Sequence, residues 1–554
     1  MKKIFILIIH ILVIIWSTRG QGAPGNLPAD ISTTEMSVDP SSTQNYIVSY
    51  TYRTALDNHP LNLTTGQADP KIEYFDGLGR PTQTIIVKGS QQGNDIIDFQ
   101  SYDNFGRVDT AYLPFTKSSN NGAYLPQSSF TGPQNTFLSE IYGSIDGSRG
   151  YYVTRYETSP LNRVLKQGAP GASWQPTAHP VNYTYETNTS PIVSWKYTGD
   201  TYSTFNYVPG TLFMTKTTDE DNKTIIEYTD KEGKIVQKET SNIITKYCYD
   251  DFGLLRCVIQ PEGTSPANAE FCFYYKYDKR KRVTDKYVPG GNWSYYIYDA
   301  RDRLVLSQDG NQRLESTPEW SYIIYDDFNR LVEQGVWATS TSRSDLETTM
   351  GTPVNLDYIR NITEKTPLKK HHYDNYNGLG QAYIFYLPDA NSLSVTQATV
   401  NIGRITWTET KLLEYEVGMN EWLISAYYYD KKNRLIQTIA DNHLGGKDYI
   451  TTAYNFTGQP IHHRQRHMAN GVTTYIDEYS DYDHRGRLMK TRFRMNGGEE
   501  LLLSANSYDE TGALVDKYLH SSGGNMFWQK IDYSYNIRGW LTQINDPVTF
   551  SEND

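Results

Sequence analysis

A seven-residue pattern recurs along the chain and constrains its fold more than any other feature. Its clearest form is Tyr482-Asp483-His484-Arg485-Gly486-Arg487-Leu488. Asp favours the first position of a type I turn because its carboxylate accepts a hydrogen bond from a backbone N–H two residues on, and Gly suits the left-handed residue that follows. Tyr and Leu on either side have strand preference. The pattern therefore predicts a β-hairpin whose short turn ends in a glycine bulge.

Fifteen copies of this pattern can be aligned, and the fifth position, here called the slot, tests the prediction. The slot holds Gly eight times, Asn five times, Asp once and Lys once. Gly, Asn and Asp adopt the left-handed conformation at least cost, so only Lys281 departs from the rule. The copies begin at Phe75, Tyr102, Tyr156, Thr218, Thr229, Tyr249, Tyr277, Tyr298, Tyr325, Tyr373, Tyr429, Tyr454, Tyr482, Tyr508 and Tyr535.

The repeat predicts an all-β protein of antiparallel hairpins, and an internal repeat overrides any domain count based on length. The copy at Tyr156 has two extra residues, and the copy at Tyr373 puts Asn377 in the slot. The turn residues expected to have structural roles include Asp103, Gly106, Asp250, Gly253, Asp326, Asn329, Asp430, Asn433, Asp483, Gly486, Asp509 and Gly512.

Composition shifts divide the chain around these copies. We expect a flexible leader over 21–44, an N-terminal β module over 45–167, repeats over 216–339, a polar excursion or mobile loop over 340–370 and further repeats over 371–554. Five prolines between 168 and 215 indicate a loose connection outside the central strands. Little sequence after Leu541 resembles a cap, so we expect a truncated C-terminal edge or a cover from elsewhere.

The first twenty residues have the features of a signal peptide. Lys2 and Lys3 precede an apolar run over 4–16, and small residues near Gly20 and Gln21 mark a cleavage site. The run is too short to span a bilayer comfortably, and no later segment is apolar enough to do so. We expect a protein that is secreted or exposed at the cell surface.

Charge and cysteine content narrow the possible partners. The net charge of −11, with no Lys/Arg-rich run, disfavours nucleic acid as a partner. Cys248, Cys257 and Cys272 are an odd number at a spacing unlike a disulfide framework, so we expect buried thiols. A bridge between Cys248 and Cys257, which flank one turn, is the alternative.

No constellation of catalytic or metal-binding residues emerges. His371-His372 and His462-His463 with His467 lie in strand-like sequence, which argues against a metal centre. The acidic stretch 219–222 resembles part of a calcium loop, but the repeat already explains its Asp and Asn. No nucleophile elbow or phosphate loop is present. We therefore expect no enzyme activity, cofactor or metal; two carboxylates facing each other in a cleft outside the turns would revive a hydrolytic reading.

The repeats resemble the YD repeats of rearrangement-hotspot (RHS) proteins, bacterial relatives of the teneurins and of toxin-complex cocoons. The stretches 72–80 (IEYFDGLGR), 441–446 (DNHLGG) and 535–545 (YNIRGWLTQIN) resemble the type that begins with a signal peptide and an uncharacterised N-terminal domain. The resemblance implies a β-sheet wound in a spiral into a hollow shell around a C-terminal toxin or effector, which is absent from this chain. The family's self-cleaving motif is absent as well, so no protease residue carries over.

Two functions from different classes follow. In the first, the chain is part of a passive shell wall whose partner is a C-terminal effector. In the second, exposed tryptophans and tyrosines hold surface glycans or a neighbouring cell, which would make the chain a carbohydrate-binding or adhesion module. These aromatic residues could instead be buried in hydrophobic cores. Exposed aromatic side chains would favour the second function, and buried ones the first.

Overall fold

The computed structural model describes residues 33–56, 63–118, 120–414, 421–523 and 526–545. The predicted signal peptide, its cleavage site at Gly20 and Gln21, and most of the predicted leader lie outside these residues.

Most strands belong to one continuous antiparallel ladder. In ladder order these are β2 (Asn45–Tyr52), β4 (Ala68–Phe75), β5 (Pro81–Ile86), β6 (Asp95–Tyr102), β7 (Val108–Tyr112), β9 (Tyr151–Tyr156), β10 (Val164–Gly168), β11 (Val181–Thr187), β14 (Phe213–Thr218), β15 (Thr224–Thr229), β16 (Ile235–Thr240), β17 (Ile243–Asp250), β18 (Leu255–Ile259), β19 (Cys272–Tyr277), β20 (Val283–Val288), β21 (Asn292–Tyr298), β22 (Leu304–Gln308), β23 (Glu319–Tyr325) and β24 (Leu331–Ala338). The ladder continues through β25 (Thr366–Asp374), β26 (Asn401–Lys411), β27 (Trp422–Tyr429), β28 (Leu435–Asp441), β29 (Lys447–Tyr454), β30 (Pro460–Ala469), β31 (Val472–Tyr482), β32 (Leu488–Met495), β33 (Leu501–Tyr508), β34 (Leu514–Gly523), β35 (Met526–Tyr535) and β36 (Leu541–Ile544).

The remaining elements branch from this ladder or cover it. The other strands are β1 (Glu35–Met36), β3 (Leu63–Thr64), β8 (Phe115–Lys117), β12 (Ile192–Thr198) and β13 (Thr201–Tyr207). The helices are α1 (Gln127–Tyr142), α2 (Ser144–Gly147), α3 (Gly310–Leu314), α4 (Arg343–Met350) and α5 (Leu387–Ser392), with short 3-10 turns η1 (Ala172–Trp174), η2 (Ala269–Phe271), η3 (Pro353–Asn355) and η4 (Gln381–Tyr383).

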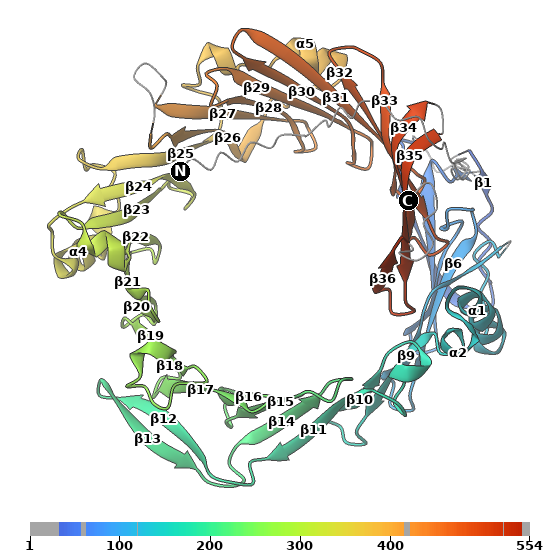
Figure 1. The fold of residues 1–554 in the computed structure, drawn as a ribbon, viewed down its shortest axis with the longest axis horizontal. Coiled ribbons are helices and arrows are strands. Elements are labelled where there is room, and N and C mark those ends of the chain that lie inside the picture. Colours follow the sequence, from blue (N-terminus) through green and yellow to red (C-terminus); the bar gives the residue numbers. More distant parts are fainter. Residues whose placement is uncertain (1–32, 57–62, 119, 415–420, 524–525, 546–554) are drawn as a thin grey trace.

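The sheet is open but curves through a full ring around an empty centre (Figure 1). Each strand pairs with its neighbours along the ladder, and within the described residues no strand pairing connects β36 back to β2. The two ends of the sheet nevertheless lie side by side, with β33 to β36 next to the N-terminal strands. The sheet is therefore a wound strip whose ends meet without sharing a ladder.

The predicted turns supply the bend that winds this strip. In the clearest copies the slot residue has a positive φ, as in Gly486 at 81°, and its N–H donates to the carbonyl of the turn acid. At the same turns the pairing register shifts by one residue, for example between Asp481 and Tyr482. Such a bulge increases twist and bends the sheet locally. Repeated at one edge of the sheet, bulges of one kind curl the strip consistently.

Lys281, the residue that departs from the slot rule, adopts the same conformation as the others, with φ 64°. A lysine in the left-handed region costs about 1–2 kcal/mol, and glycine removes that cost while losing up to about 1 kcal/mol in chain entropy. Lys281→Gly should therefore raise the free energy of unfolding by about 0.5–1 kcal/mol in denaturant titrations. Lys279→Gly, in the same turn but without positive φ, is the control and should be neutral or destabilising.

Three sequence expectations need correction. The copy at Tyr373 does not form the predicted turn, because Asp374 and Gly378, rather than Asn377, have positive φ. The prediction of a loose connection over 168–215 was wrong, since β11 pairs on both sides with β10 and β14. Its prolines all lie outside the strands, as Pro180 does directly before β11, so no ladder hydrogen bond is lost.

The polar stretch over 340–370 forms a covering element rather than a plain loop. Ser342 caps α4 by accepting a hydrogen bond from the N–H of Asp345. The helix buries Leu346 and Met350. The stretch is polar because only one face of this short helix contacts the sheet.

The hydrophobic cores lie on the outside of the ring. Leu346 and Met350 of α4 pack with Trp320, Tyr322 and Ile324 of β23, and α4 lies outside the ring in Figure 1. The core around α1 and the core beside α5 are built in the same way, from long connections that fold back over the outer face. The opposite face of the sheet is left to line the central space.

Candidate functional site

The inner wall of the ring is built from the strand residues that alternate with the outer cores. On β23, Ser321, Ile323 and Tyr325 alternate with the buried Trp320 and its neighbours, so they face inward. The same alternation places His463, Gln465 and His467 of β30 on the inner face. Tyr325, which begins its turn pattern, ends this row and also packs at the margin of the core around Trp320.

An arginine links Tyr325 to the preceding repeat. Arg303 pairs with Asp299 of its own turn at 2.7 Å, and its guanidinium lies 4.8 Å from the ring centre of Tyr325. The Tyr325 hydroxyl in turn donates to the carbonyl of Leu304 at 3.0 Å. A cation–π contact and a hydrogen bond thus join these two consecutive repeats.

This arginine was not singled out from the sequence, although the signal was available. Arg follows the slot directly in eight of the fifteen copies. In all eight it pairs with the acid of its own turn and lies over a tyrosine farther along the ladder. These arginines are Arg80, Arg107, Arg163, Arg282, Arg303, Arg330, Arg434 and Arg487.

Asp374, the acid of the copy that lacks the predicted turn, has partners outside that turn. Arg330 pairs with Asp326 of its own turn and also binds both oxygens of Asp374 at 2.8 Å. These hydrogen bonds hold the pKa of Asp374 below its ordinary value. Asp374 also accepts from the Gly403 N–H, so it serves the neighbouring strands instead of closing a turn of its own.

The two ends of the sheet meet at a seam made of side chains. His484 is buried there, and its Nε2 donates to the Lys88 carbonyl at 2.9 Å. Gln91 accepts from the Tyr508 N–H at 2.8 Å. Asn94 donates to Glu510 at 3.0 Å. Turns near the C-terminal end therefore rest on the loop between β5 and β6.

The last turn continues this seam. Ile537 is buried at 6% exposure and packs beside Gly171. Arg538 pairs with Glu220 at 2.8 Å and lies between the rings of Trp174 and Trp540. Polar and apolar contacts together hold the ends of the open sheet in register.

Acid should weaken the seam through His484. Burial lowers the pKa of His484, with Arg487 also lowering it and Asp483, Asp69 and the Lys88 carbonyl opposing the shift. A lowered folded-state pKa means that the unfolded chain binds the extra proton, so stability is lost as the pH falls below about 6.5. Hydrogen exchange at 483–489 and 87–94 should speed up between pH 7.5 and 5.5.

His484→Gln, whose amide can still donate to Lys88, should reduce that pH dependence. His443→Gln, in an exposed loop, should leave it unchanged. Equal pH dependence in the two variants would show that His484 does not carry the effect.

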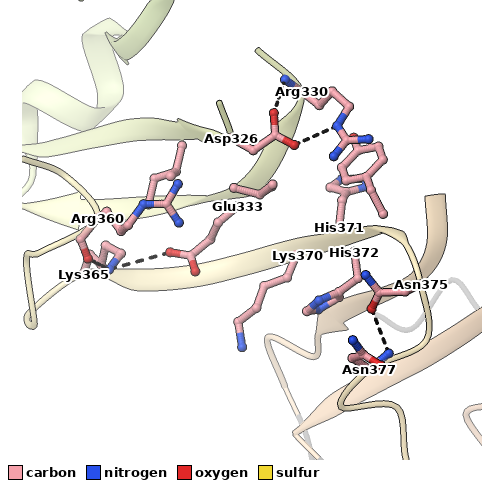
Figure 2. Close-up of a pocket in the computed structure, with 13 residues that line it drawn as sticks. Asp326, Arg330, Glu333, Arg360, Lys365, Lys370, His371, His372, Asn375 and Asn377 are labelled. Carbon is pink, nitrogen blue, oxygen red and sulfur yellow. Dashed lines mark hydrogen bonds and ion pairs between the residues drawn. The ribbon is translucent and has the colours of Figure 1, made fainter. Parts of the chain in front are cut away.

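A polar pocket opens on the wall beside β24 and β25 (Figure 2). Its volume is about 440 Å³, within the range of small-ligand sites. The cationic side chains that line it are engaged: Arg360 with Asp357, Lys365 with backbone carbonyls and Lys370 with Glu409 at 3.4 Å. Its lining carries four Arg or Lys side chains and two carboxylates, and presents no nucleophile paired with a base.

The histidines that the sequence analysis weighed as metal ligands, and for which it expected no metal, have other partners. His372 stacks on Trp407 and contacts Glu409, while His462 contacts Asp477 and His467 contacts Asp448. Burial lowers the pKa of His371, His462 and His463. In the part of the chain that the structure describes, no three His, Cys, Asp or Glu side chains gather as a metal site.

The acidic stretch 219–222 forms a turn of the repeat type. The Asp219 carboxylate accepts from the N–H groups of Asp221 and Lys223, and Asn222 has φ 62°. The same hydrogen bonds recur at Asp250, Asp326, Asp430 and Asp483. The carboxylates of these turns therefore stabilise the turns through hydrogen bonds to backbone N–H groups.

The three cysteines are free and buried in one core beneath the β12–β13 hairpin. Cys248 and Cys257 are directly opposite across β17 and β18. Burial raises the pKa of Cys248 to about 12, so its thiol is protonated and unreactive at neutral pH. The predicted buried thiols are present, and the alternative bridge is not.

Carboxylates and tryptophans give little support to the other functions. Asp516 and Asp532 face each other across β34 and β35, but the Lys530 ammonium binds both at 3.0 and 2.5 Å. Trp320, Trp337 and Trp407 are buried. Trp528 and Trp540 are exposed, and Trp540 stacks on Arg538.

Among the described residues, no helix is long and apolar enough to cross a membrane.

The fold and its inner wall define a repeat protein of antiparallel β-hairpins. A family model described as a domain of unknown function, DUF6443, matches residues 48–187. That match spans the N-terminal strands and the first of the three stretches that suggested the RHS resemblance. No curated protein matches the chain.

Several solved toxin structures are similar to the chain at low identity. A TcdB2-TccC3 structure without its hypervariable C-terminal region has a TM-score of 0.40 and 14% identity, covering 88% of this chain and 23% of that one. A Tc holotoxin pore of Photorhabdus luminescens has a TM-score of 0.40 and 13% identity, with the same coverage. The chain thus spans about a quarter of the length of these structures.

Proposed function

We propose that the chain forms part of the wall of a hollow protein shell. The observation that carries the proposal is the open sheet wound into a ring, with the helices α1, α4 and α5 and the cores beneath them on its outer side. In a passive wall, the turn carboxylates and the arginines that bind them serve to join neighbouring repeats. We propose no catalytic role for it.

The contents of the shell are the second part of the proposal. The RHS resemblance implies that a C-terminal toxin or effector of a longer protein lies inside, and the signal-like N-terminus implies export to the cell surface or beyond. The ring suits such a role because α1, α2, α4 and α5 lie on its outer side and leave its central space open (Figure 1).

Protease protection tests this function. In a longer polypeptide in which an effector segment follows the wall, that segment should be cut at least about tenfold more slowly than the same segment alone, because a protease must wait for the wall to open. Cleavage at equal rates would exclude encapsulation.

A seam variant sharpens the test. Ile537→Asp with Arg538→Ala places a charge against Gly171 and removes the ion pair with Glu220, so it should open the ring and restore cleavage. Arg301→Ala, an exposed arginine in another turn, is the matched control and should keep the segment protected.

A further inference from the structure

The two edges of the wound strip differ in kind. Successive connections in an antiparallel ladder alternate between the edges of the sheet, so turns two strands apart share an edge. By this count the pattern turns lie on one edge, here called the turn rim, and only 219–222 lies on the other. The opposite edge, here called the loop rim, carries the connections 87–94, 169–180, 309–318, 442–446 and 496–500.

The seam shows what the turn rim binds. His484, Glu510 and Ile537 belong to turn-rim turns, and each contacts a loop-rim segment of the N-terminal strands. The partners of these residues are Lys88, Asn94 and Gly171 respectively. Even the ion pair of Arg538 follows this rule, because Glu220 lies in the one pattern turn on the loop rim. The contact is therefore turn rim against loop rim throughout.

Burial at the turn rim depends on whether a loop rim lies against it. At the seam His484 and Ile537, each the third residue of its turn, are 5% and 6% exposed. The third residues of turns away from the seam are exposed, as Asn104, Asp251 and Asp327 are. Away from the seam, Phe105, Phe252 and Phe328 precede the slot residue in their turns and are 69%, 76% and 77% exposed. Leu78 and Leu161 occupy the equivalent position and are also exposed. These apolar residues share one turn position, which other turn-rim turns fill with polar residues such as Glu232, Arg280 and Lys432. They form an interrupted row, which isolated exposed residues do not.

The loop rim away from the seam carries an apolar row as well. Leu314, Leu444, Val472 and Leu501 lie in or beside its connections and are exposed. Both surfaces that meet at the seam thus carry exposed apolar side chains at several places around the ring. A second copy of this chain presents the rim that each of them fits.

We propose that the turn rim of one copy binds the loop rim of a second copy, so that rings stack head to tail. Such a contact is heterologous, because each copy uses a different surface. It repeats between molecules the contact that the seam makes within one molecule. The stacking does not depend on what the shell contains.

Two variants of the purified full chain test this proposal by sedimentation. The turn-rim variant carries Phe105→Ser, Phe252→Ser and Phe328→Ser, and the loop-rim variant carries Leu314→Asp, Leu444→Asp and Leu501→Asp. The unchanged chain should self-associate as its concentration rises. Each variant alone should associate at least about tenfold more weakly.

Mixing the two variants gives the decisive result. The intact turn rim of one should bind the intact loop rim of the other, giving a one-to-one dimer that cannot grow. A control with Val193→Ser, Phe205→Ser and Trp528→Ser removes exposed apolar groups from the strands and should associate like the unchanged chain. An unchanged chain that stays monomeric up to about 100 μM, or a mixture that forms no dimer, would overturn the proposal.

Discussion

Replacing Arg330 with alanine should lower the free energy of unfolding by about 2 kcal/mol, since charge-assisted hydrogen bonds to two carboxylates and a stacking contact are lost together. Arg330 binds Asp326 and Asp374, and its guanidinium lies 4.3 Å from the ring centre of Tyr373. These groups are partly screened by solvent, which keeps the expected loss below that of a fully buried pair. Denaturant titration at pH 7 measures it.

Arg330→Lys should recover only part of this loss, because an ammonium cannot bind both oxygens of Asp374 in parallel while stacking on Tyr373. The stability that Asp374 contributes is present above its unfolded pKa of about 3.9 and is lost as the pH falls through its lower folded value, so the gap should narrow in acid. Arg301→Ala, in the preceding turn and exposed, should cost little. A comparable loss in both alanine variants would count against the linking role.

Replacing Trp320 with alanine should cost about 3–5 kcal/mol, the range for removing a large aromatic side chain from a core. Trp320 is 2% exposed and packs against α4 through the cluster that includes Leu346. The cavity would lie between the sheet and α4, so hydrogen exchange over 343–350 should speed up more than exchange in β30. Denaturant titration gives the size of the loss.

Trp528 offers a matched control, because it is 68% exposed on β35. Trp528→Ala should change the free energy of unfolding by no more than about 0.5 kcal/mol. If the two substitutions had equal effects, the outer cores would not be where the structure places them.

Turn chemistry made the fold readable from the sequence. The residues in the slot are those that tolerate positive φ, and Asp at the first turn position supplies a carboxylate for two backbone N–H groups. Because these requirements are local, they produce a residue pattern with fixed spacing that can be recognised in the sequence. Even Lys281 follows the geometry, which means that neighbouring strands can impose the turn where the residue itself is unfavourable.

The misjudged parts depend on contacts distant in sequence. Asp374 closes no turn of its own and instead binds Arg330, 44 residues earlier in the chain. The helix α4 is polar in sequence and is fixed by a face that only the folded sheet provides. The segment over 168–215 was assigned by its prolines, but their position at strand ends decides their effect. The seam has no sequence pattern, since it joins residues such as His484 and Lys88 through the winding of the whole strip.

Because the two ends of the sheet are not joined by strand pairing, the number of strands in the ring is not fixed by barrel closure. In a closed barrel the number of strands, their tilt and their stagger are fixed together. Here an added pair of strands would lengthen the strip and slide its ends along each other, with the turns staying on the same edge. A single added strand would transfer every later turn to the opposite edge. The increment by which such a wall can grow or shrink during evolution is therefore the two-strand repeat.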